Sequence, residues 1–119
     1  MRVAIAACMM MVTAAHAADL PRPSMRQIAV IEQQIGKGIA MPPGSGALKD
    51  HDRHYWIENG DGLVLAQFVS SASPRKHRGV VHSTSRSEYR PVTDGGCAIL
   101  NLVYYGEGDA RNHIRCGGR

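Results

Sequence analysis

The sequence predicts an α+β protein, in which one N-terminal helix packs on a four- to five-stranded antiparallel sheet that carries one disulfide. Three observations lead to this prediction. Isoleucines recur every three or four residues in the first third of the chain, short apolar segments separated by turn residues follow them, and two cysteines lie in the last quarter. The chain has 119 residues, so we expect a single small domain with a modest core.

The first 17 residues have the layout of a secretory signal peptide. Arg2 supplies a positive charge, residues 3–12 are almost entirely apolar, and Ala15-His16-Ala17 has small residues where a signal peptidase reads the chain. Cleavage after Ala17 would remove one arginine and no acid, which lowers the formal net charge from +4 to +3. Residues 18–119 would then form one domain without a transmembrane segment, because no apolar run is long enough to span a bilayer. We therefore expect a periplasmic or secreted protein.

The cysteines fit an oxidising compartment. Cleavage leaves Cys97 and Cys116, an even pair that we expect to form one structural disulfide. Their spacing matches neither a redox-active Cys-x-x-Cys motif nor a zinc site. Cys8 leaves an alternative open, since Ile5-Ala6-Ala7-Cys8 resembles a lipoprotein processing box that would tether the protein to a membrane.

A helix is predicted from about residue 25 to 38. Ser24 and Gln27 have the spacing of a capping box, and the isoleucines that follow place one apolar stripe on the helix. Pro42-Pro43 forbids its continuation. The stripe consists of Ile28, Ile31, Ile35 and Ile39, and the opposite side is expected to carry Arg26, Glu32, Gln33 and Lys37.

The rest of the chain predicts strands near residues 54–57, 63–69, 80–82, 97–105 and 110–116. A tight turn on Gly106 and Glu107 would place Cys97 directly opposite Cys116 and Ile99 opposite Ile114. In that register Leu100 and the apolar residues that share its face lie opposite charged residues of the last strand. A charged edge strand of this kind discourages edge-to-edge aggregation.

Two polar clusters are candidate sites. On a strand, Asp50, Asp52 and His54 would share one face, where imidazole and carboxylate groups are a plausible metal-ligand set, and an enzyme or metal site on His51 and His54 is the corresponding alternative. Four residues form the densest basic run and are a candidate site for anionic groups. Few aromatic residues accompany the charges, so we expect no nucleic-acid partner, and we expect no cofactor. The basic run is Arg75, Lys76, His77 and Arg78.

Two resemblances follow from motifs in the C-terminal half. His54-Tyr55, the segment Pro91-x-x-Asp94-Gly95-Gly96-Cys97 and the closing Cys116-x-Gly118 resemble a group of small exported bacterial proteins of unknown function. That resemblance implies a periplasmic location and a terminal disulfide, without an activity. More faintly, Gln67-Phe68-Val69-Ser70 is similar to the Gln-x-Val-x-Gly loop of cystatins, although Ser71 stands where the glycine should be. The second resemblance implies a cystatin-like fold and inhibition of cysteine proteases.

These observations favour a non-enzymatic exported domain that acts by binding or as an accessory factor. Its partner would be an envelope protein or an anionic component of the envelope. The alternatives are a small metal-binding protein or enzyme that uses His51 and His54, and a cystatin-like protease inhibitor.

Overall fold

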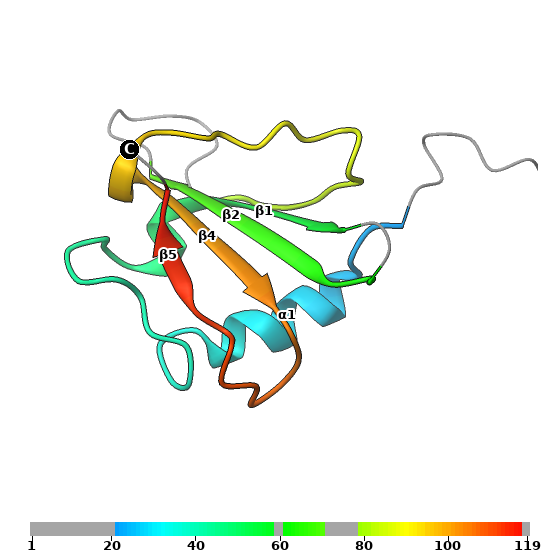
Figure 1. Cartoon of the computed structure of the whole chain (residues 1–119), viewed down its shortest axis with the longest axis horizontal. Coiled ribbons are helices and arrows are strands. Elements are labelled where there is room, and N and C mark those ends of the chain that lie inside the picture. Colours follow the sequence, from blue (N-terminus) through cyan, green and yellow to red (C-terminus); the bar gives the residue numbers. More distant parts are fainter. Residues whose placement is uncertain (1–20, 59–60, 71–78, 118–119) are drawn as a thin grey trace, which may run out of the picture.

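The computed structural model describes residues 21–58, 61–70 and 79–117. In this part of the chain one helix and a five-stranded sheet form an α+β fold, as the sequence predicts (Figure 1). None of the helices described is long and apolar enough to cross a membrane. The elements are α1 (Met25–Gln34), β1 (His51–Ile57), β2 (Val64–Ser70), β3 (Val81–Ser83), β4 (Ile99–Tyr104) and β5 (Ile114–Cys116), with 3₁₀ helices at Leu48–Asp50 and Gly96–Ala98.

Helix α1 begins where the sequence predicts and ends four residues earlier. The Ser24 hydroxyl caps it by accepting a hydrogen bond from the backbone N–H of Gln27 at 3.0 Å. Ile35 is already extended, and Gly36 follows in the left-handed region with φ of 92°, which favours glycine. The helix therefore buries only Ile28 and Ile31 of the predicted stripe within its own length.

The sheet is mixed, which corrects the prediction of a purely antiparallel sheet. The strand order is β3-β1-β2-β4-β5, and β3 runs parallel to β1 while the other neighbours are antiparallel. The reason lies in the connections. Strand β2 ends at Ser70 beside His51, the first residue of β1, and the chain re-enters the sheet at Val81, beside Arg53. A chain that returns to the end where β1 starts must run in the same direction as β1.

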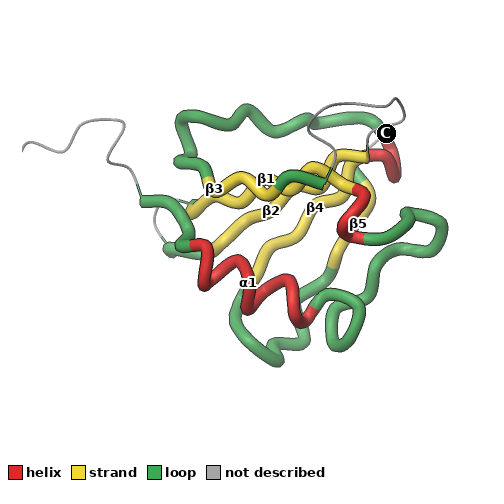
Figure 2. The backbone as a smooth tube through the Cα atoms, turned by 180° about the vertical axis from the view of Figure 1, so that it is seen from behind, coloured by secondary structure: helices red, strands yellow, loops and turns green. Residues whose placement is uncertain are grey.

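The two faces of the sheet have different covers. Helix α1 lies on one face, and residues 84–95 pass along the other, as both views of the backbone show (Figures 1 and 2). We call residues 84–95 the strap, and the sheet face beneath it the outer face. The core lies on the helix side and consists of Ile28, Ile31, Ile39, Tyr55, Val64, Ala66, Phe68, Leu100, Leu102 and Ile114.

The register between β4 and β5 differs by three residues from the prediction. Cys116 pairs with Leu100 instead of Cys97, and Ile114 pairs with Leu102 instead of Ile99. The tight turn does not form, because the Asn112 side chain bonds the backbone just after β4: it accepts from Tyr105 N at 2.7 Å and donates to the Gly106 carbonyl at 2.6 Å. Strand β5 consequently starts only at Ile114. An odd shift moves each side chain to the other face, so apolar residues of the two strands meet on the core side.

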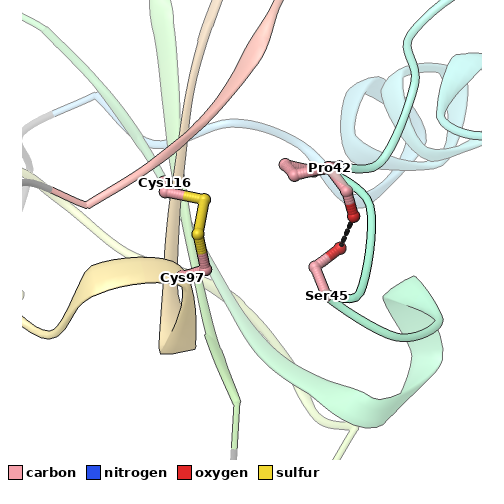
Figure 3. Close-up of a disulfide and its surroundings, with 4 residues drawn as sticks. All are labelled: Pro42, Ser45, Cys97 and Cys116. Atoms are coloured by element: carbon pink, nitrogen blue, oxygen red, sulfur yellow. Dashed lines mark hydrogen bonds between the residues drawn. A yellow bond between two sulfur atoms is a disulfide. The ribbon is translucent and has the colours of Figure 1, made fainter.

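Cys97 and Cys116 form the predicted disulfide, although they are not opposite one another in the sheet. Cys97 lies in the 3₁₀ helix Gly96–Ala98, which brings its Cα to 4.4 Å from that of Cys116 (Figure 3). The neighbouring loop turns at Pro42, whose carbonyl accepts a hydrogen bond from Ser45 Oγ at 2.6 Å. Two glycines allow close packing here, since a Cβ on Gly95 or Gly117 would lie 2.7 or 3.1 Å from Ile99 side-chain atoms.

A buried ion pair joins α1 to β1. Glu32 faces the sheet, which corrects the prediction that it lies on the opposite side of the helix. Its carboxylate accepts from Arg53 Nε at 2.7 Å, from Arg53 Nη2 at 3.2 Å and from the Tyr55 hydroxyl at 2.8 Å. Arg53 Nη1 donates to the Leu48 carbonyl at 3.1 Å. Burial, followed by the negative charge of Glu32, raises the pKa of Tyr55, so its hydroxyl remains a donor.

Removal of the disulfide should lower stability substantially. The cysteines are 19 residues apart, and a closed loop of this size contributes about 3 kcal/mol through restriction of the unfolded chain. We therefore expect the double variant Cys97→Ala/Cys116→Ala to lose about 3 kcal/mol of unfolding free energy in urea titrations. A loss below about 1 kcal/mol would show that the disulfide contributes little to the free energy of unfolding.

Glu32→Gln should destabilise the fold because it leaves the buried Arg53 guanidinium without its counter-charge. The side chains of Arg53 and Glu32 are only 10% and 19% exposed, and breaking such a pair costs about 3 kcal/mol or more. Glu58→Gln is the matched control, since the Arg86–Glu58 pair is exposed and its loss should cost at most about 1 kcal/mol. Equal losses in the two variants, measured by urea unfolding, would contradict the assigned importance of the buried pair.

Candidate binding face

A column of stacked rings lies on the outer face at the β3 side. The His54 ring lies between His82, with centroids 4.5 Å apart, and Tyr89 of the strap, with centroids 4.1 Å apart. Both pairs are nearly parallel, with interplanar angles of 6° and 5°. Trp56 packs against the same Tyr89 ring at 5.4 Å. The rings fix the strap on the sheet at Tyr89.

His54 favours its neutral form. Burial lowers its pKa below the usual 6.5, and the adjacent His82 lowers it further, while Asp52 acts in the opposite direction. Its Nδ1 atom is buried and has no hydrogen-bond partner in the part of the chain that the structure describes. A proton on Nδ1 would therefore be buried without an acceptor among the described residues.

Gln67 holds the middle of the strap. Its Nε2 donates to the Val92 carbonyl and to Asn101 Oδ1, both at 2.9 Å. Its Oε1 accepts from Val92 N at 2.9 Å and from the Tyr89 hydroxyl. Burial raises the pKa of Tyr89 to about 12, so the phenol keeps the proton that it donates. A single buried side chain thus links β2, β4 and the strap.

A cavity of about 520 Å³ opens beside the strap. Trp56 and Tyr89 contribute aromatic rings to its wall, and Leu65 and Val103 contribute apolar side chains. At the rim, Arg86 Nε lies 3.3 Å from a carboxylate oxygen of Glu58. The remaining lining residues are Ala66, Gln67, Pro91, Val92, Thr93, Asn101 and Leu102.

A second cavity of about 230 Å³ continues toward β5 and shares Asn101 and Val103 with the first. Its other lining residues are Tyr105, Arg111, His113 and Arg115, so it contains three basic side chains and no acidic one. We call the two cavities together the outer groove. It has an aromatic end under the strap and a basic end over β4 and β5, and this combination suits a small ligand with an apolar ring and polar or charged substituents.

The structure places the sequence-predicted site residues in separate environments. The candidate anion site at Arg75, Lys76, His77 and Arg78 lies outside the described residues. Asp50 closes the 3₁₀ helix Leu48–Asp50 and is not part of the strand, whereas Asp52 accepts a hydrogen bond from Val80 N at 3.3 Å. Within the described ranges no three His, Cys, Asp or Glu side chains come together as a possible metal site.

His51 and His54 lie on opposite faces of β1, as strand alternation requires for residues three apart. His51 is 1% exposed, with Nδ1 at 2.8 Å from the Ala47 carbonyl and Nε2 without a partner. The Ala47 contact assigns the proton to Nδ1. The two histidines therefore cannot serve one site.

The stretch that is similar to the cystatin loop, Gln67 to Ser70, lies inside β2. Strand β2 is central in the sheet and pairs with β1 and β4 on its two sides. Gln67 itself is 1% exposed. This backbone is not available to enter another protein as a loop.

The sequence analysis did not identify the residues of the outer groove, although two isolated polar residues indicated them. Gln67 and Asn101 are isolated polar residues in otherwise apolar strands, and the two are register partners. A lone polar side chain in a buried strand needs a hydrogen-bond partner, and a second such residue in another strand is an obvious candidate. Arg115 was expected opposite the apolar face of β4, and the true register places it beside Asn101.

Searches with family models, against characterised proteins and against solved structures found no match to this chain.

Stability should fall in acid in a manner that depends on His54. The pKa of His54 is lowered in the folded protein, so the unfolded chain binds more protons at intermediate pH. Unfolding free energy should therefore be highest above pH 6.5 and fall as the pH drops through 6.5 toward the folded pKa.

The measurement is urea unfolding at a series of pH values from about 7.5 to about 5, which brackets the ordinary histidine range. His54→Phe retains a flat ring between His82 and Tyr89 but cannot titrate, and should show a shallower decline with acid than the wild type. Identical slopes for the two proteins would contradict the role given to His54.

Proposed function

We propose that this protein is an exported, non-enzymatic binding domain whose ligand occupies the outer groove. One observation carries the proposal: the two cavities adjoin at Asn101 and Val103, which line both, and they combine aromatic, amide and basic side chains on a face that α1 leaves free. Ligand sites in proteins have this character, with an apolar wall and a few placed polar groups.

Export is supported by the signal-like residues 1–17 and by the disulfide. A covalent link between Cys97 and Cys116 is typical of proteins in oxidising compartments. The resemblance to small exported bacterial proteins, which rests on Asp94-Gly95-Gly96-Cys97, points the same way. The periplasm or the extracellular medium is therefore the proposed location.

Binding is favoured over catalysis because the polar groups of the outer face already serve the structure. All four hydrogen bonds of the Gln67 amide hold the strap or Asn101. His54 is stacked between two rings, and its free nitrogen is buried. A general base must reach a proton on the substrate, and the buried Nδ1 of His54 cannot do so. The groove is therefore proposed to recognise a ligand and to carry out no chemical step.

Fragment binding observed by NMR tests where ligands bind, without knowledge of the natural ligand. We expect neutral and charged monocyclic fragments to shift the backbone amides of β2, β4 and the strap, together with the indole signal of Trp56. That indole signal is unambiguous because the chain has one tryptophan.

Val103→Phe should fill the junction of the two cavities and abolish these shifts while the fold is retained. Val30→Phe is the matched control, since Val30 is 40% exposed on α1 and lines neither cavity. Shifts that survive in Val103→Phe, or that cluster on α1, would refute the outer groove as the binding site.

A further inference from the structure

We infer that the ligand of the outer groove is an acidic saccharide, whose carboxylate is held at the basic end by Arg115, Arg111 and Asn101. The inference rests on the proposed function and adds the chemical class of the ligand. Its starting point is the lining of the second cavity, which contains two arginines and a histidine without any acidic side chain.

Arg115 is the free charge of this end. Of the two arginines that line the second cavity, Arg111 forms an ion pair with Asp109, and Arg115 forms none with any described residue. It is exposed on β5 and lies opposite Asn101 of β4, so a planar guanidinium and an amide occupy neighbouring positions on the same face. A guanidinium presents parallel N–H donors that match the two oxygens of a carboxylate.

Arg111 is held in place before any ligand arrives. Its guanidinium lies over the Tyr105 ring, with Cζ 4.1 Å from the centroid, and its Nε and Nη2 donate to Asp109 at 3.1 and 2.9 Å. Asp109 offsets the charge of Arg111, and the interaction lowers the pKa of that carboxyl to about 2. Arg111 therefore acts as an oriented donor, while Arg115 supplies the net positive charge.

The surface around the groove favours a saccharide over a membrane. The described part of the chain exposes only three large hydrophobic side chains, and two of them, Met25 and Val30, lie on α1. Val92 is the only one of the three on the strap, which is too little apolar surface to enter a lipid layer.

A peptide is also less suitable. A bound strand gains affinity by pairing its backbone with the edge of a sheet. The aromatic end of the outer groove lies over side chains of β2 and β4, and both of these strands already have partners on each side. Only the basic end reaches an edge strand, β5, which offers three residues for pairing. A sugar ring needs no backbone partner, because its C–H face packs on aromatic side chains and its hydroxyls bond to amides and guanidinium groups. Trp56, Asn101 and Arg115 provide these three kinds of group.

The experiment compares saccharides that differ at one carbon of each ring, where a carboxylate replaces a neutral hydroxymethyl group. Trigalacturonic acid and the neutral galactose trimer are titrated into the whole protein by calorimetry, with Trp56 fluorescence as a second readout. The acidic trimer should bind about tenfold or more tightly than the neutral one, which is the effect expected for a hydrogen bond to a charged group.

Arg115→Gln should remove this preference by weakening only the acidic trimer, again by about tenfold. Arg26→Gln is the matched control, because Arg26 is an exposed arginine on α1. Higher salt should weaken the acidic trimer alone. Equal affinity for the two trimers, or an unchanged preference in Arg115→Gln, would overturn the inference.

Two further probes address the competing classes of ligand. Triglutamate carries the same charge on a peptide, and vesicles that contain an anionic phospholipid present it on a membrane. Binding of either at least as tightly as trigalacturonic acid would overturn the saccharide assignment. If fragments occupy the outer groove but no acidic trimer binds, the inference fails and the proposed function stands; if fragments also avoid the groove, both fail.

Discussion

The direction of β3 is the constraint on which the outer face depends. Because β3 is parallel to β1, it ends level with Tyr55, where Thr84 N donates to the Tyr55 carbonyl at 2.9 Å. Strand β4, however, begins beside Val69 at the opposite end of the sheet. The chain must therefore travel back along the strands, and α1 already covers one face. The strap over the outer face is the result, and the groove exists because this strap covers β1 and part of β2 but leaves β4 and β5 open.

Each face of the sheet has its own polar anchor. On the core side the Glu32 carboxylate accepts hydrogen bonds from Arg53 and Tyr55, and these bonds link α1 to β1. On the outer side the Gln67 amide donates a hydrogen bond to Val92 and accepts one from it, and these bonds link the strap to β2. Both side chains are largely buried, where an unsatisfied polar atom would be costly. The disulfide adds a third link between the start of β4 and the end of β5. A domain of this size has a small core, so these specific contacts determine which arrangement of a few short strands is stable.

The sequence predicted local structure well and long-range pairing poorly. The cap at Ser24 and the disulfide are confirmed, and so is the first half of the isoleucine stripe, Ile28 and Ile31; Ile35 and Ile39 lie beyond the end of α1. The β4–β5 register was wrong because it depended on how Asn112 bonds the loop, and the assumption that bridged cysteines face one another across a hairpin overlooked the 3₁₀ helix at Cys97. The parallel placement of β3 depends on the route of a long connection, which no pattern in the sequence specifies. The groove could not be predicted for the same reasons, since it requires both the strap and the true register.

The register between β4 and β5 couples the core to the candidate site. A shift by three residues exchanges the faces of β5 relative to β4. In the observed register Ile114 joins Leu102 in the core, and Arg115 joins Asn101 on the outer face. Burial of the apolar side chain on one side therefore fixes the position of the guanidinium on the other. The packing of β5 thus places Arg115 on the outer face without an ion pair, whereas Arg111, which precedes β5, is held by Asp109 and Tyr105. This explains how a short edge strand with one exposed cation, Arg115, can present a defined surface to a ligand.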